Sequence, residues 1–198
     1  MGAGFLAALA LAAATLAAVG AERTGVETAL RLTAILGFLF FWPSYAGGAL
    51  ATLFGETWRP LRRRARVLGM AFSAVLAVHL SLVALLCWIG SAPPAETFAI
   101  FGVGAICAYV MLLGSIDRVR RTLGEGSWRA VQTIGANYIL FAFALDLVGQ
   151  PPRPSVGYLT LYLPTAILTV LAPVLRFLAW LKPRWEALRA NRPGRMWI

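Results

Sequence analysis

The chain is poor in charged side chains and in side chains that bind metals. Of its 198 residues only 13% are charged and 60% are hydrophobic, and it holds a single histidine and two cysteines. A soluble domain normally carries about 25% charged residues, so this composition excludes an ordinary water-soluble fold. Apolar runs of about 20 residues cross a bilayer as helices. The sequence therefore predicts an all-α integral membrane protein.

The few cysteines and the placement of the charge exclude further classes. Cys87 and Cys107 fall inside apolar runs and form no CxxC or CxxCH pattern, which excludes the usual zinc and covalent-haem motifs. We expect both to be free thiols that pack as small apolar side chains.

The net charge of +10 is carried by short arginine clusters between apolar runs. Because no polar domain carries that charge, we expect no nucleic acid as a partner.

Six apolar runs are long enough to cross a membrane. The first has no arginine or lysine before it, and we interpret it as a helix rather than a signal peptide. Pro93-Pro94 and Pro151-Pro152 lie between runs, where helices stop, and Trp42 with Pro43 predicts a bend or end of the second helix. Together the runs predict one six-helix transmembrane domain, residues 1–180. The spans are expected at about 2–19, 25–45, 67–89, 97–116, 131–148 and 158–178.

Basic residues alternate between the connections. The loops after the second and fourth spans and the tail 181–198 are rich in arginine, whereas the other connections hold one arginine at most. Because basic loops stay in the cytoplasm, we expect both termini inside. Tryptophans among the basic residues of the tail predict a segment on the anionic inner surface. The basic residues are Arg59, Arg62, Arg63, Arg64 and Arg66; Arg118, Arg120, Arg121 and Arg129; and Lys182, Arg184, Arg189, Arg192 and Arg195.

Two ionisable residues lie deep in the apolar runs. His79 comes about 20 Å of helix after Arg66, and Arg31 lies about 9 Å into the second span. Ionisable groups inside lipid are costly and mark functional sites. His79 is either hydrogen-bonded to a neighbouring helix or bound to a metal. Arg31 is either neutralised by Glu27 or Asp146 or contacts a carboxylate of a bound cofactor.

Several motifs follow one another in the order of a known membrane family. Thr24-Gly25 open the second span, Pro43 lies near its end, and Arg66-Val67-Leu68-Gly69 come shortly before His79. The segment 115–132, SIDRVRRTLGEGSWRAVQ, supplies a serine, paired arginines, a Leu-Gly and a tryptophan. Over roughly residues 20–180, the chain resembles the ferric reductase-like transmembrane domain family, which includes the haem-binding membrane subunit of the periplasmic methionine sulfoxide reductase system.

The resemblance implies a six-helix bundle that holds haem for electron transfer across the membrane. It places His79 at the position of an axial ligand to the haem iron and makes Arg31 a candidate contact for a haem propionate. The chain departs from the family at Gln132, where a histidine stands in the family, and near Leu145 and Asp146, where a second histidine would fall. With one histidine, the chain is expected to hold at most one haem b, ligated by His79 alone.

Two functions stay open at this point. The first is a divergent transmembrane electron-transfer subunit with one haem b on His79. This chain has no catalytic motif and no flavin or nicotinamide domain, so its electron donor and acceptor would be separate proteins or a quinone. The second is a haem-free structural or accessory subunit of a larger complex, with a membrane or periplasmic protein as partner. A carrier is a third hypothesis, but the paired repeats and broken helices of transporters are not evident.

Overall fold

All long elements of the structure are helices. The computed structural model describes residues 1–148 and 158–190, and six helices within them are long and apolar enough to cross a membrane. The prediction of an all-α bundle with six spans is therefore confirmed. The long helices are α1 (Gly2–Val19), α2 (Arg23–Phe54), α3 (Arg59–Trp88), α4 (Ala95–Leu113), α6 (Glu125–Leu147) and α7 (Leu163–Ala190). The short elements are the 3₁₀ turn η1 (Glu56–Trp58), α5 (Asp117–Leu123) and the π turn η2 (Tyr158–Tyr162).

Large apolar side chains cover the outside of the bundle. Ile106, Ile134 and Phe177 are 64%, 69% and 58% exposed, respectively. A water-soluble protein rarely exposes a continuous apolar surface, whereas hydrocarbon is a suitable solvent for one. The exposed surface therefore agrees with the helix lengths in indicating a membrane protein.

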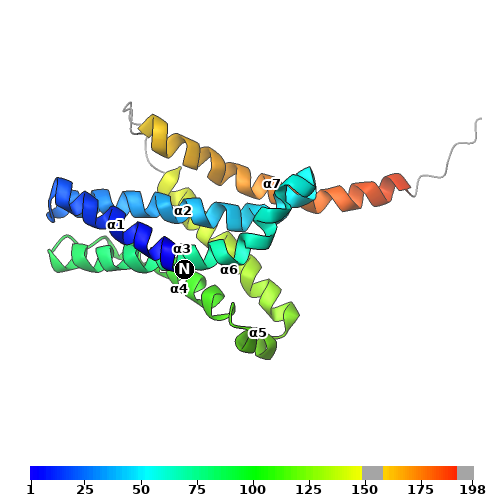
Figure 1. Cartoon of the computed structure of the whole chain (residues 1–198), viewed down its shortest axis with the longest axis horizontal. Coiled ribbons are helices and arrows are strands. Elements are labelled where there is room, and N and C mark those ends of the chain that lie inside the picture. Colours follow the sequence, from blue (N-terminus) through cyan, green and yellow to red (C-terminus); the bar gives the residue numbers. More distant parts are fainter. Residues whose placement is uncertain (149–157, 191–198) are drawn as a thin grey trace, which may run out of the picture.

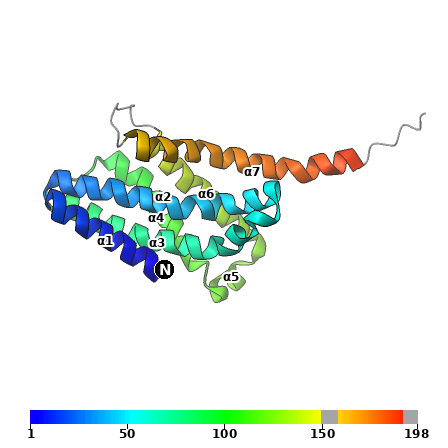
Figure 2. The same ribbon diagram turned by 45° about the horizontal axis from the view of Figure 1, so that its top comes forward.

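Helix α2 is the centre of the bundle. It contacts α1, α3 and α7, and α4 contacts chiefly α6. Figures 1 and 2 show α7 along one face of the bundle, with its carboxy-terminal part extending beyond the other helices.

One end of the bundle gathers most of the arginines, and we call it the arginine-rich end. There α2 ends, α3 begins, and α5 leads into α6. The ammonium group of Lys182 on α7 donates a hydrogen bond to the carbonyl oxygen of Thr52 on α2, at 2.9 Å. The basic residues of four chain segments thus meet at the same end of the molecule.

Small residues hold α1 against the bundle. All the buried residues of α1 are small, and they recur every three or four positions, which places them on one helical face. Small side chains allow membrane helices to approach closely. The buried residues are Gly4, Ala8, Ala12 and Thr15, and Ala8 and Ala12 pack in one cluster with Ala29, Val75, Val78 and Leu82 of α2 and α3.

Two glycines are required where chain segments meet at very short range. Gly20 ends α1 with a φ of 100°, and a Cβ atom on Gly25 would collide with the carbonyl of Gly20. The tight turn between α1 and α2 therefore requires glycine at position 25. A Cβ atom on Gly114 would collide with the indole of Trp128, which is buried. Gly114 thus allows α4 to reach α6 at the arginine-rich end.

The second helix extends well beyond the predicted end of its span. It continues past Pro43 to Phe54, although proline removes one helical hydrogen bond. The residues after Pro43 include Ala46, Ala49 and Leu50, which are buried in the main core cluster. Helices in proteins draw most of their stability from such packing, so burial outweighs the local cost of the proline.

The arginine clusters lie on helices, and their assignment to loops was wrong. Positive charge therefore resides on helix ends, while the contrast in charge between the two ends of the bundle is unchanged. Residues 181–190 of the predicted tail continue α7; residues 191–198 and Pro151-Pro152 lie outside the described residues. Arg59, Arg62, Arg63, Arg64 and Arg66 belong to α3, Arg118, Arg120 and Arg121 to α5, and Arg129 to α6.

The contact between Gly114 and Trp128 gives the first prediction. A Gly114→Ala variant should lose about 1–3 kcal/mol of stability, because the added methyl group overpacks the contact with the indole. The loss is measured in mild detergent by heating samples to a series of temperatures. The thermal midpoint is the temperature at which half of the protein is still monodisperse. Gly126→Ala is the control, since a Cβ atom on Gly126 meets no heavy atom within 4 Å. Equal midpoints for the two variants would contradict the packing.

Candidate functional site

A cavity of about 320 Å³ lies among α2, α3, α4 and α6, and we call it the histidine cavity. This volume is near the lower limit for small-molecule sites, which is about 300 Å³. Its wall is mostly apolar and includes three glycines, Gly37, Gly102 and Gly104. The ionisable side chains that line it are Arg31, His79 and Asp146. Three charged or ligating groups thus meet in an apolar space inside the bundle.

A hydrogen bond to α2 fixes the orientation of His79. The imidazole Nδ1 lies 3.0 Å from Oγ1 of Thr33, whose side chain is completely buried. The threonine hydroxyl itself donates to a backbone carbonyl, with Ala29 O at 2.9 Å and Leu30 O at 3.0 Å. When the single hydrogen of that hydroxyl points to a backbone carbonyl, Nδ1–H of His79 donates to Thr33, so the tautomer of the imidazole sets the direction of this bond.

The second imidazole nitrogen of His79, Nε2, is the candidate for binding a ligand. The contacts of the imidazole are the hydrogen bond between Nδ1 and Thr33 and one with the backbone of Leu30, and Nε2 has no hydrogen bond to a side chain of the described residues. In the tautomer with Nδ1–H, Nε2 carries a lone pair. Metal-binding histidines usually have their other nitrogen held in this way by an oxygen atom. The predicted hydrogen bond to a neighbouring helix is confirmed.

Arg31 and Asp146 form the charged part of the histidine cavity. Both side chains line it, and the guanidinium attracts the carboxylate electrostatically. Glu27, the other predicted partner of Arg31, instead pairs with Arg23 at 2.8 Å. Asp146 stands where the resemblance would have placed a second histidine of the family, and the structure brings it into the same cavity as His79.

A second cavity, of about 470 Å³, lies toward the arginine-rich end, and we call it the arginine cavity. Its lining includes four arginines together with Gln132. Gln132 and His79 therefore line different cavities. Gln132, where the resemblance implies a histidine, is therefore not positioned to act with His79. The four arginines are Arg66, Arg120, Arg129 and Arg176.

Four phenylalanines form a cluster between the two cavities. Phe72 lines both of them, and its ring centroid lies 5.3 Å from that of Phe41 and 6.1 Å from that of Phe143. Phe143 also packs edge-on against Phe38, with centroids 5.2 Å apart. Such aromatic pairs are stabilising at these separations. The cluster therefore forms a packed layer between the histidine cavity and the arginine cavity.

The sequence analysis missed Arg176, the half-buried arginine of α7. Its guanidinium lies over the ring of Tyr45, with 4.4 Å from Cζ to the ring centroid. The hydroxyl of Tyr45 in turn donates to Oδ1 of Asn137 at 2.6 Å. One signal was present in the sequence: Arg176 stands between Leu175 and Phe177 inside an apolar run, where an arginine is a functional candidate by default.

Among the described residues that line the histidine cavity there is no methionine, no cysteine and no second histidine, and Asp146 is the one carboxylate. Met111 and Cys107 pack close to Gly135, in the contact between α4 and α6, and neither lines the histidine cavity. The described part of the chain holds no cluster of three or more histidine, cysteine, aspartate or glutamate side chains that could bind a metal ion. A metal in the histidine cavity would depend on His79 and on further ligands from its own cofactor.

Comparison with protein-family models, with curated proteins and with solved structures finds no match for this chain. The resemblance to the ferric reductase-like family therefore stays a prediction that depends on the motifs in the sequence.

The hydrogen bond between Thr33 and His79 gives the second prediction. A Thr33→Val variant should lose about 1–3 kcal/mol of stability, because it leaves the buried Nδ1 of His79 without a partner. Thr28→Val is the control on the same helix, since the hydroxyl of Thr28 donates only to the exposed carbonyl of Thr24. Thermal midpoints in detergent compare the two variants. Equal losses would show that the imidazole does not depend on Thr33.

Proposed function

We propose that this protein is a transmembrane electron-transfer subunit that would hold one haem b in the histidine cavity, with His79 as the residue that binds its iron. The observation that carries this proposal is the state of the imidazole. Its Nδ1 is held by the buried hydroxyl of Thr33 at 3.0 Å, and Nε2 remains for iron. The motifs that resemble the ferric reductase-like family support the same assignment.

The residues that line the histidine cavity suit a flat apolar cofactor that is bound through one of its two faces. Glycines leave space beside the imidazole, and aromatic side chains such as Phe98 and Phe101 suit a macrocycle. Haem supplies one-electron chemistry at its iron when it is bound. Because no methionine, cysteine or second histidine of the described residues lines this cavity, His79 alone would hold the iron. Asp146 is the ionisable group that α6 contributes to this cavity.

Arg31 is the residue that we expect to bind a propionate of the cofactor. It lies in the first part of α2, about 9 Å from Gly25 by helical rise, on the wall of the same cavity as His79. A guanidinium binds a carboxylate through two parallel hydrogen bonds. Asp146 lines the same cavity as Arg31. The electron donor and acceptor are membrane or periplasmic proteins, or a quinone.

A haem-free accessory subunit of a larger membrane complex is the second candidate. The observation that favours it is the carboxy-terminal part of α7, which extends beyond the other helices (Figure 2). Trp180 and Trp185 on this segment are 54% and 57% exposed, and Arg184 stacks on Trp180 at 3.4 Å from the ring centroid. Exposed aromatic and arginine side chains are enriched in protein interfaces. This segment would then bind the partner protein.

The optical spectrum of the purified protein distinguishes the two functions. Protein extracted mildly from its native membrane should show a Soret band that shifts when dithionite is added. The band should vanish in a His79→Ala variant, because the only imidazole is lost. A Gln132→Ala variant is the control and should keep the band, since Gln132 lines the other cavity. A colourless wild-type protein would exclude the haem proposal and favour the accessory subunit.

We also propose that the arginine-rich end faces the cytoplasm of a bacterium, with both termini inside. The basic residues gathered at that end support this orientation, because basic segments resist translocation. Reporter proteins fused after Ile198 test it directly. A green fluorescent protein should fluoresce there, and alkaline phosphatase should be inactive. An active phosphatase at that position would show that the carboxy terminus lies outside and would contradict this orientation.

A further inference from the structure

The arginine cavity has a surplus of positive charge. Its four arginines come from α3, α5, α6 and α7, and no carboxylate of the described residues lines it. Two carboxylates lie nearby, outside the lining. Asp117 lies 3.4 Å from Arg66, and Glu125 lies 3.7 Å from Arg120 and 3.3 Å from Arg129. All these pairs are exposed, and exposed ion pairs contribute little.

Arg176 pairs with an aromatic ring rather than a carboxylate. It is half-buried, and in the described part of the chain no carboxylate lies within ion-pair distance of it. The ring of Tyr45 attracts the guanidinium but does not neutralise its charge. An arginine inside a transmembrane span is costly and normally faces a partner or a polar cavity. An anion in the arginine cavity would be such a partner for Arg176.

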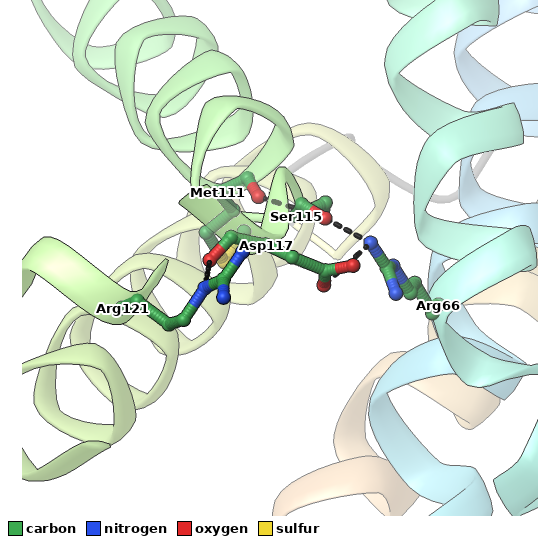
Figure 3. A network of polar contacts seen from close by, with 5 residues as sticks. All are labelled: Arg66, Met111, Ser115, Asp117 and Arg121. Carbon is green, nitrogen blue, oxygen red and sulfur yellow. Dashed lines mark hydrogen bonds and ion pairs between the residues drawn. The ribbon is translucent and has the colours of Figure 1, made fainter. Parts of the chain in front are cut away.

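A polar network lies at one wall of this cavity. Figure 3 shows Arg66 donating hydrogen bonds to the carbonyl of Ser115 and to the carboxylate of Asp117. Arg121 donates to the backbone carbonyl of Asp117 at 3.3 Å, and the hydroxyl of Ser115 donates to that of Met111 at 3.0 Å. The network joins α3 to the segment between α4 and α5. It places Arg66 beside the carbonyl of Ser115 and the carboxylate of Asp117.

The other polar groups of the cavity indicate what kind of ligand fits. The hydroxyls of Ser44, Ser73 and Thr133 already donate to backbone carbonyls, at 2.8, 3.2 and 2.8 Å. The remaining donors are the guanidinium groups and the amide of Gln132, which makes no hydrogen bond with any described residue. Four guanidinium groups face two exposed carboxylates outside the lining, Asp117 and Glu125, and the charged donors left over suit a phosphate group, which offers several acceptor oxygens.

The rest of the wall is apolar, and its depth matches the edge of the hydrocarbon. Phe41, Met70 and Leu112 belong to this apolar wall. Arg66 and Arg129 lie at or just before the start of the apolar runs of α3 and α6. A ligand in this position can place a charged group among the arginines and hydrocarbon chains against the apolar wall. Basic pockets between transmembrane helices bind lipid head groups in this way.

We infer that the arginine cavity binds the phosphate head group of an anionic phospholipid that enters from the leaflet at the arginine-rich end. Arg129 and Arg176 contact the phosphate, Arg66 lies at the wall, and the acyl chains lie along Phe41, Met70 and their apolar neighbours. The inference is independent of the haem proposal, because it concerns a different cavity and different residues.

The test measures the phosphatidylglycerol that stays with the protein. The wild type and an Arg129→Gln/Arg176→Gln variant are expressed in the same bacterial host, purified in mild detergent, and extracted for lipid mass spectrometry. The wild type should retain about one molecule per chain, and the double variant should retain at least about tenfold less. An Arg62→Gln/Arg63→Gln variant is the matched control, because it removes the same charge from α3 outside the cavity.

Three results would overturn the inference. They are a wild type without retained phosphatidylglycerol, equal retention in the two double variants, and a thermal midpoint that inorganic phosphate raises as much as phosphatidylglycerol does. The second would indicate general attraction to the arginine-rich end, and the third would indicate a site for a free anion.

If the double variant fails to stay monodisperse, the single Arg129→Gln variant replaces it, because that side chain is 74% exposed. A several-fold lower retention is expected for it, and unchanged retention would contradict the inference.

Discussion

Hydrocarbon offers no hydrogen-bond partners, so polar side chains inside this bundle must satisfy one another. The described residues meet that demand, since none leaves a buried side-chain nitrogen or oxygen without a partner. The contacts that do so also join the helices. Thr33 joins α2 to α3 through His79, the indole of Trp42 joins α2 to α7 through the carbonyl of Leu168, and Tyr45 joins α2 to α6 through Asn137. The same constraint that stabilises the bundle therefore also determines how His79 is held.

The polar side chains inside the bundle line two separate cavities. The histidine cavity combines one imidazole with Arg31 and Asp146 in an apolar wall. The arginine cavity gathers guanidinium groups at the arginine-rich end, and the phenylalanine cluster around Phe72 lies between them. A cofactor in the first and a lipid in the second would not compete. The lipid would brace the helices that surround the cofactor.

Much of the fold could be predicted from the sequence, because apolar runs directly report the length of hydrocarbon that a helix crosses. The ends of helices were harder to predict. Packing carries α2 past Pro43, and the arginines before Val67 continue α3 rather than form a loop. A hydrogen bond from His79 to a neighbouring helix was one of two alternatives that the sequence offered, but its partner Thr33 could not be predicted, because contacts between helices depend on how they face one another. The sequence shows Arg176 inside an apolar run, but only the structure shows that its guanidinium lies over the ring of Tyr45.

The central claim is that His79 alone, held through Nδ1 by Thr33, ligates one haem iron. Electron paramagnetic resonance of the oxidised protein, purified mildly from its native membrane, tests it most directly, because the spin state of ferric haem reports the number of strong axial ligands. A high-spin signal that is absent from a His79→Ala variant is the predicted result. A low-spin signal would reveal a second strong ligand. The absence of any haem signal in the wild type would contradict the account outright.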